Sequence, residues 1–405
     1  MDKKSLNILC ISRYFKGGAF FPAAKAAGNN VFLLTSSKLK TEAWPWESID
    51  ETFYMNEDAE GKWNMPHVIN GLAHKMKKTK FDVLIALDDF DVEIVAHIRE
   101  HFRIPGMGET TCRHFRDKLA MRMKAKEANI PIPSFTSLFN DEDIHNFCKM
   151  VDGPWLIKPR TAASAMGIVK CHTEEEVWKT IEDLGDQRHH NLMEQFAPGD
   201  VYHVDGLNVE GEVVFASASQ YLDTPMEVAQ GGGIFRSQTV DFGSKDHKKL
   251  LAINKKLMKA FGMNYSATHS EFIKSHSDGK FYFLETASRV GGANIAEMVE
   301  ASSGINLWAE WARIEDAKFK EKSYKLPKPT KLNAGIVVSL SRYEKPDTSS
   351  FAEEEVVWRM NKAWHIGMIV RSDKRERITE LLEAYGKRIA GEFHASLPPE
   401  EAPRH

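Results

Sequence analysis

The first hundred residues alternate between short apolar runs and segments with apolar positions at helical spacing. Residues 6–12, 31–35 and 81–87 are rich in Leu, Ile and Val, whereas residues 88–102 follow a helical pattern. Strands that alternate with helices build parallel sheets covered by those helices. The pattern therefore predicts a small doubly wound parallel sheet at the start of the chain.

The middle of the chain mixes both patterns. Residues 113–129 form a basic segment with apolar positions near one face, which predicts a helix. A strand is predicted from Gly153 to Arg160, and the small residues 161–167 after it leave backbone amides free to meet phosphate oxygens. Helices are also predicted at residues 141–150 and 173–184, and a strand at residues 191–196.

Strand patterns dominate beyond residue 200. Alternation over residues 201–221 predicts two antiparallel strands, and residues 245–261 predict a helix. A stretch containing Pro and Lys, residues 324–331, precedes the final segment. This segment is predicted to hold strands near 332–340 and 364–370 and a closing helix over 378–393.

Size, charge and cysteine usage narrow the class of protein. A chain of 405 residues is too long for one hydrophobic core, so we expect two to four domains or lobes. A net charge of −3 without a basic stripe argues against nucleic acid as a partner, and the first apolar run is too short to span a membrane. The four scattered cysteines suit a reduced compartment. We therefore expect a cytoplasmic protein with a small-molecule partner.

Two glutamates carry the clearest chemical signal. Glu271 and Glu285 lie on predicted neighbouring strands joined by a short turn, and the alternation around each places both carboxylates on facing positions. Like charges at that separation repel, so a cation is expected between them, and Mg²⁺ prefers such oxygen ligands. Arg289 follows before a turn of small residues, where its guanidinium could reach an anion held by the metal.

Three aspartates lie where the third predicted strand hands over to a helix, namely Asp88, Asp89 and Asp91. Carboxylates at such positions accept hydrogen bonds from the free amides of the first helical turn. We interpret these residues as helix caps rather than catalytic groups.

The order of these features along the chain resembles that of the ATP-grasp superfamily, over about residues 1–315. The HSEF and LETASRVGG segments further resemble the branch of L-amino-acid ligases that make dipeptides. The features are Asp117-Lys118 after a Pro-Gly break, a strand ending in Lys158, a small-residue loop, a strand with Glu194-Gln195-Phe196, and the hairpin with Glu271, Glu285 and Arg289.

The resemblance implies an α/β and α+β architecture in four parts. A Rossmann-like pre-ATP-grasp domain is expected over residues 1–112 and the central ATP-grasp lobe over residues 113–200. The C-terminal lobe with the metal site is expected over residues 201–318, and a small α+β domain over residues 319–405. A homodimer through the first or last domain is common among relatives.

The resemblance also implies an ATP site. Lys118 and Lys158 would hold the phosphates, and Glu194 and Phe196 would offer backbone groups to the adenine. Asp200 falls where an acidic group commonly holds the ribose hydroxyls, although a plain turn residue is an equal alternative. The loop with Ser164 and Gly167 would close over the phosphates.

Metal, catalytic and substrate roles follow in the same way. Glu271 and Glu285 would bind Mg²⁺ or Mn²⁺, and Arg289 would stabilise the reacting groups. Glu285 is followed by Thr286-Ala287, whereas many ATP-grasp enzymes have Glu-x-Asn, so the metal would depend on the two glutamates. Residues near the substrates would be His269, Gly291, Gly292, Ala293 and Arg236.

The implied reaction joins a carboxylate to an amine. The γ-phosphate of ATP would pass to the carboxylate, and an amine, such as that of an amino acid, would displace phosphate from the acylphosphate. Two alternatives remain open at this stage: a nucleotide-biosynthesis ligase on the same scaffold, and a regulatory protein that binds ATP without turnover.

Overall fold

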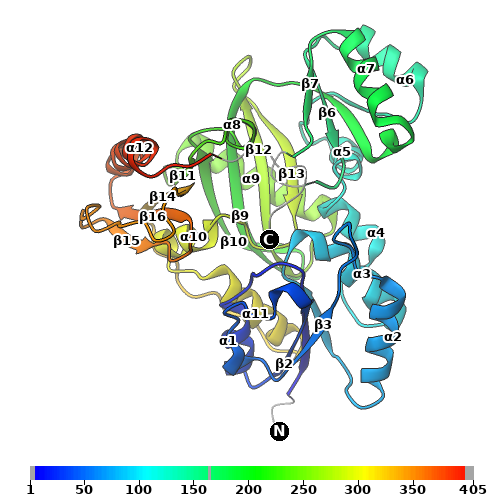
Figure 1. The fold of residues 1–405 in the computed structure, drawn as a ribbon, viewed down its shortest axis with the longest axis vertical. Helices are drawn as coiled ribbons and strands as arrows, with labels where there is room; N and C mark the ends of the chain where they lie inside the picture. Colours follow the sequence, from blue (N-terminus) through cyan, green and yellow to red (C-terminus); the bar gives the residue numbers. More distant parts are fainter. Residues whose placement is uncertain (1–4, 163–165, 397–405) are drawn as a thin grey trace.

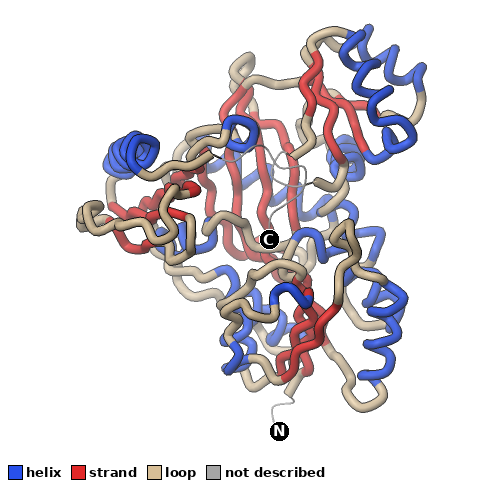
Figure 2. The backbone as a smooth tube through the Cα atoms, in the orientation of Figure 1, coloured by secondary structure: helices blue, strands red, loops and turns tan. Residues whose placement is uncertain are grey.

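The computed structural model describes residues 5–162 and 166–396, whose strands form three sheets (Figures 1 and 2). The N-terminal sheet lies at the bottom of Figure 1, the large sheet fills the centre, and the smallest unit stands at the upper right. None of the helices in the described ranges is long and apolar enough to cross a membrane.

The N-terminal sheet is parallel, in the order β3-β2-β1-β4. Helices cover both faces, so its central strands are buried and read as continuous apolar runs, as the sequence predicts. The edge strand β3 is not predicted, because its residues are exposed or only partly buried and form no buried apolar run. The elements are β1 Asn7–Ser12, α1 Phe20–Ala26, β2 Asn30–Ser36, β3 Glu51–Met55, α2 Met65–Met76, β4 Val83–Ala86 and α3 Val92–Phe102.

The central lobe is an antiparallel sheet in the order β5-β8-β6-β7, with two helices packed on it. Its own apolar core includes Leu138, Ile157 and Ile181. The predicted helices and strands of this region are confirmed. The elements are β5 Phe135–Ser137, α6 Asp141–Met150, β6 Trp155–Pro159, β7 Val169–Cys171, α7 Glu174–Leu184 and β8 Asn191–Gln195.

The large sheet has eight strands in the order β13-β12-β9-β10-β11-β14-β16-β15. The glutamate hairpin forms one edge, and the last three strands of the chain extend the other edge through the pairing of β11 with β14. The boundary expected near residue 319 thus falls between strands that share one sheet, and the four-part division stays a prediction. The strands are β9 Gly199–Val209, β10 Glu212–Tyr221, β11 Phe235–Thr239, β12 Ser266–Ser275, β13 Phe281–Ala287, β14 Asn333–Leu340, β15 Val356–Arg359 and β16 His365–Ser372.

The helices around this sheet include two that the sequence predicts, α9 and α12. The large apolar side chains of α12, Leu382 and Ile389 among them, are buried against the C-terminal strands. The helices are α8 Pro225–Gly231, α9 Lys245–Phe261, α10 Ile295–Ser303, α11 Leu307–Phe319 and α12 Arg375–Glu392.

The basic helix that connects the first two parts is shorter than predicted. Helix α5 spans Lys118–Glu127, because the Asp117 side chain accepts hydrogen bonds from the amides of Leu119 and Ala120 and so starts the helix there. This cap places Lys118 in the first turn of α5. Short helical segments precede it and occur elsewhere: η1 Ser37–Leu39, η2 Trp46–Ser48, η3 Asp89–Asp91, α4 Glu109–Cys112, η4 Arg113–Phe115 and η5 Gly185–His190.

Candidate active site

A cleft of about 630 Å³ is lined by residues from the N-terminal part, the central lobe and the large sheet. It contains most of the side chains that the sequence singles out. Those lining it are Lys118, Lys158, Glu194, Phe196, His269, Glu271, Glu285, Arg289, Gly292 and Ala293.

The two glutamates face each other as predicted. Glu271 on β12 is the register partner of Glu285 on β13, and a bulge follows Glu271. Lys118 Nζ lies 2.7 Å from Glu285 Oε2. Burial alone would raise the pKa of Glu285, but Lys118, together with Lys158 and His269, lowers the pKa to about 2. The cleft therefore holds an ionised carboxylate that already attracts a cation.

Glu271 is held by two neighbours. The Tyr221 hydroxyl donates a 2.9 Å hydrogen bond to Glu271 Oε1, and His269 Nε2 lies 3.4 Å from the same oxygen. Burial, and next the Glu271 charge, raise the pKa of Tyr221 well above its usual value. Tyr221 therefore stays a neutral donor that orients the carboxylate.

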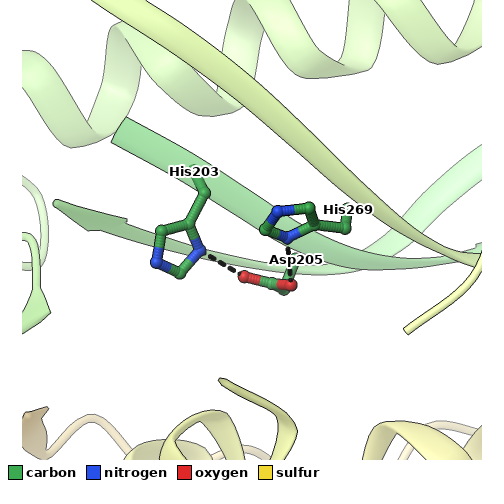
Figure 3. A group of neighbouring side chains, drawn as sticks. All are labelled: His203, Asp205 and His269. Atoms are coloured by element: carbon green, nitrogen blue, oxygen red, sulfur yellow. Dashed lines mark hydrogen bonds and ion pairs between the residues drawn. The ribbon is translucent and has the colours of Figure 1, made fainter. Parts of the chain in front are cut away.

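A buried charge network continues from His269 (Figure 3). Asp205 lies between two histidines, with one carboxylate oxygen 2.6 Å from His203 Nδ1 and the other 2.9 Å from His269 Nδ1. Burial by itself would lower the pKa of His269, yet Asp205 raises it to about 9. His203 Nε2 reaches the Ser237 hydroxyl at 2.8 Å. The network thus connects β11, β9 and β12 to Glu271.

The turn after Arg289 packs against this network. A Cβ atom on Gly291 would lie 2.7 Å from Asp205 Oδ1 and 3.0 Å from His269 Nδ1, so only glycine fits there. Gly292 and Ala293 line the cleft, and Ala293 has a positive φ of 51°. Arg289 Nη1 donates to the Val290 carbonyl oxygen at 3.0 Å.

Lys158 belongs to a second buried ion network. Glu194 lies 2.5 Å from Lys158 Nζ and 2.6 Å from Arg122 Nε, and all three side chains are buried. Burial lowers the pKa of Lys158 to about 8, although Glu194 opposes this effect. The sequence predicts only backbone groups from Glu194, whereas its side chain neutralises two cations. Arg122 was missed because it lies on a helix whose other basic residues suggest a solvated face.

Of the other predicted nucleotide residues, Phe196 lines the cleft, whereas Asp200 and Gly167 are not among the described residues that line it and instead neighbour residues that do. Lys170 Nζ lies over the Phe196 ring, 3.7 Å from the centroid. Asp200 on β9 lies beside His276 of the cleft wall, with Oδ1 3.3 Å from His276 Nε2. Gly167 has a φ of 68° and lies against Pro159, between two residues that line the cleft. Ser164 lies outside the described residues.

Arg236 does not join these residues. Its guanidinium pairs with Asp223 at 2.8 Å and packs against Gly386 of α12. It is not among the described residues that line the cleft. The sequence suggests Arg236 because it follows a glycine run, but its β11 position directs it toward the C-terminal helix.

The fold and the cleft together define the class of protein. The fold is the ATP-grasp fold: it has a parallel N-terminal domain, a small antiparallel lobe and a large antiparallel sheet. These three parts enclose a cleft that contains two lysines and two facing glutamates. The predicted resemblance to ATP-grasp carboxylate-amine ligases is confirmed by comparison with known proteins.

The curated relatives that this chain matches include amino-acid ligases. The chain is 27% identical to the L-arginine-specific L-amino acid ligase of Bacillus subtilis over 242 residues, 58% of this chain and 57% of the relative. It is 22% identical to the D-alanine–D-alanine ligase of Neisseria gonorrhoeae over 193 residues, 47% of this chain and 63% of the relative. The chain thus spans less than two thirds of these relatives. No model of a known protein family matches it.

Two solved structures illustrate the shared fold. The L-amino acid ligase of Bacillus licheniformis superposes with a TM-score of 0.73 at 17% identity, covering 98% of this chain and all of that one. The biotin carboxylase domain of the Hydrogenobacter thermophilus 2-oxoglutarate carboxylase, solved with MgADP, superposes with a TM-score of 0.72 at 15% identity, covering 94% of this chain and 89% of that one.

Proposed function

We propose that this protein is an ATP-dependent ligase that forms an amide or peptide bond through an acylphosphate and releases ADP and phosphate. The observation that carries the proposal is the facing pair Glu271 and Glu285, in one cleft with Lys118, Lys158 and Arg289. The amino-acid ligases among its relatives favour amino acids as substrates, and an L-amino-acid (dipeptide) ligase is the form that we propose.

ATP would lie at the end of the cleft that contains the two lysines. Lys118 and Lys158 come from different elements and supply flexible positive charges for the phosphates. The Glu194 backbone and Phe196 would border the adenine, and Asp200, which contacts His276 of the cleft lining, would meet the ribose. Glu194 also fixes Lys158 before the nucleotide arrives, so little reorganisation accompanies binding.

The glutamate pair fits a divalent cation. Carboxylate oxygens are the ligands that Mg²⁺ prefers, and the ammonium of Lys118 at Glu285 shows that this position stabilises positive charge. A bound Mg²⁺ or Mn²⁺ would neutralise charge between the substrate carboxylate and the γ-phosphate. Tyr221 and His269 hold Glu271 in place for this role.

Arg289 would act on the reacting groups themselves. Burial alone would lower its pKa, but Asp89 and Asp88 raise it, so the guanidinium stays charged. A fixed cation beside the glutamate pair would stabilise the negative charge that develops on the acylphosphate and on the tetrahedral intermediate. The amine nitrogen attacks the acyl carbon, the carbon–oxygen bond to phosphate breaks, and the amine loses a proton.

The proposal is tested by phosphate release from ATP in the presence of Mg²⁺ and pools of L-amino acids, with products identified by mass spectrometry. Release that requires particular amino-acid pairs and yields their dipeptide supports it. Release only with an amine of a phosphorylated sugar would instead indicate the nucleotide-biosynthesis reaction. ATP binding without release under every pool would indicate a regulatory protein.

A single substitution tests the metal assignment. Glu285→Gln should lower the rate of phosphate release by about two to three orders of magnitude, because it removes a charge on which the reacting groups depend. Glu212→Gln is the matched control, since Glu212 is exposed on β10 and pairs with Lys255 away from the cleft. A Glu285→Gln protein with normal turnover at limiting Mg²⁺ would refute the assignment.

A further inference from the structure

Three charged side chains from separate elements meet at the end of the cleft next to the N-terminal sheet. Asp89 follows β4 at the carboxyl edge of that sheet, Arg116 lies between η4 and α5, and Arg289 follows β13. All three line the cleft. Ligands of open parallel sheets bind outside the carboxyl ends of the strands, so this edge is a natural place for a substrate group.

Asp89 differs from the aspartates beside it. Asp88 caps η3 by accepting from the Phe90 amide and also pairs with Lys16, and Asp91 binds Arg13 through both carboxylate oxygens. The interpretation as a helix cap is therefore confirmed for Asp88. Asp91 already forms an ion pair with Arg13. Neither Asp88 nor Asp91 is among the described residues that line the cleft.

Asp89 and its neighbours keep polar atoms without partners. Asp89 Oδ2 accepts a 3.2 Å hydrogen bond from Arg116 Nη1, but Asp89 Oδ1 has no hydrogen-bond partner within the described part of the chain. The same holds there for Arg116 Nε and Arg289 Nε. Asp89 is 8% exposed and Arg116 is 6% exposed. Buried polar groups without partners are costly, so such a set indicates that a ligand completes it.

The chemistry of the unpaired atoms defines the ligand. A carboxylate oxygen accepts from a cation, whereas two guanidinium nitrogens donate to an anion. We infer that this cluster binds the zwitterionic head group of an α-amino acid, with its ammonium on Asp89 Oδ1 and its carboxylate on Arg116 and Arg289. The inference rests on the proposed function and narrows its substrate class. The phosphate of a phosphorylated sugar, which carries negative charge, would be repelled by Asp89.

Calorimetric titration of the full chain with Mg²⁺ and a nonhydrolysable ATP analogue tests the inference. The titrants are the L-amino acid that gives the largest phosphate release, its N-acetyl derivative and its amide. The free amino acid should bind about tenfold to a hundredfold more tightly than either derivative, because each derivative removes one charged partner. An N-acetyl derivative that binds as tightly as the free amino acid would overturn the inference.

Asp89→Asn is the variant that addresses the residue itself. It should remove at least about tenfold of the preference for the free amino acid over the N-acetyl derivative, while ATP-analogue affinity is retained. Asp91→Asn is the matched control, since it changes a neighbouring buried carboxylate that is committed to Arg13. A preference unchanged in Asp89→Asn would contradict the assignment.

The two proposals fail in different ways. Phosphate release with carboxylates that lack an ammonium group would support the ligase proposal but refute the amino-acid subsite. If no acid and amine pair gives release, the ligase is refuted, and each of the L-amino acids is then titrated directly. Failure of all of them to bind would refute the subsite as well.

Discussion

The buried charged side chains at the two ends of the cleft are paired to different extents. At the nucleotide end, Glu194 compensates Lys158 and Arg122 in a compact network of short ion pairs. At the other end, Asp89 and Arg116 share one longer hydrogen bond, and Asp89 Oδ1 has neither a hydrogen bond nor an ion pair in the described chain. Arg122 Nε and Glu194 Oε1 also lack a hydrogen bond, but they form an ion pair with each other at 2.6 Å. The first end is organised before any ligand binds, whereas the second awaits one. Stability should therefore depend on the first end and substrate discrimination on the second.

The largest effect is expected from breaking the nucleotide-end network. Glu194→Gln leaves two buried cations without their counter-charge, so the free energy of unfolding should fall by about 3 to 5 kcal/mol. Denaturant titration measures the change, and Glu60→Gln, in an exposed pair with Lys62, is the control that should leave the midpoint unaltered. A midpoint unaltered in Glu194→Gln would show that the network adds no stability.

The buried network of His203, Asp205 and His269 should make the free energy of unfolding depend on pH. Because Asp205 raises the folded pKa of His269 to about 9, above its usual 6.5, this contribution is fully present below pH 6.5 and is lost as the pH rises through 9. It amounts to about 3 kcal/mol at most. Thermal unfolding of wild type and His269→Gln between pH 6 and 9.5 should converge as the pH rises. Parallel curves would contradict the linkage.

A smaller effect is expected where the Arg289 turn touches that network. Gly291→Ala forces a Cβ atom against Asp205 and His269, which should cost about 1 to 3 kcal/mol of stability. Gly292→Ala is a close control, because a Cβ there meets no described atom within 4 Å. Equal unfolding midpoints for the two variants would show that the turn accommodates a Cβ atom at position 291 without strain.

The smallest effect on stability is expected at the substrate end. Asp89→Asn should lower the free energy of unfolding by about 1 to 2 kcal/mol, since the amide oxygen still accepts from Arg116 and Asp88 still lies near Arg289. The same denaturant titration as for Glu194→Gln sharpens the contrast. A loss as large as that of Glu194→Gln would mean that Asp89 is structural.

Local patterns predicted the hairpin well. The alternation around Glu271 and Glu285 indicates which side of each strand they occupy, and the short turn leaves little freedom in the register. The strands β1, β2 and β4 and the helices α9 and α12 were equally clear, because buried apolar runs and helical spacing are local signals. The edge strand β3, whose residues are exposed or only partly buried, has no such signal.

Residue type and order along the chain determined the parallel first domain, the facing glutamates and the likeness to ATP-grasp ligases. Only the tertiary structure decided which charges meet. It joined Glu194 to Arg122 and Lys158, directed Arg236 away to Asp223, and left Asp89 open to the cleft while its neighbours were paired. The reason is physical: a charge on a helix or loop looks the same in sequence whether water or another side chain neutralises it, and that choice depends on contacts between distant segments.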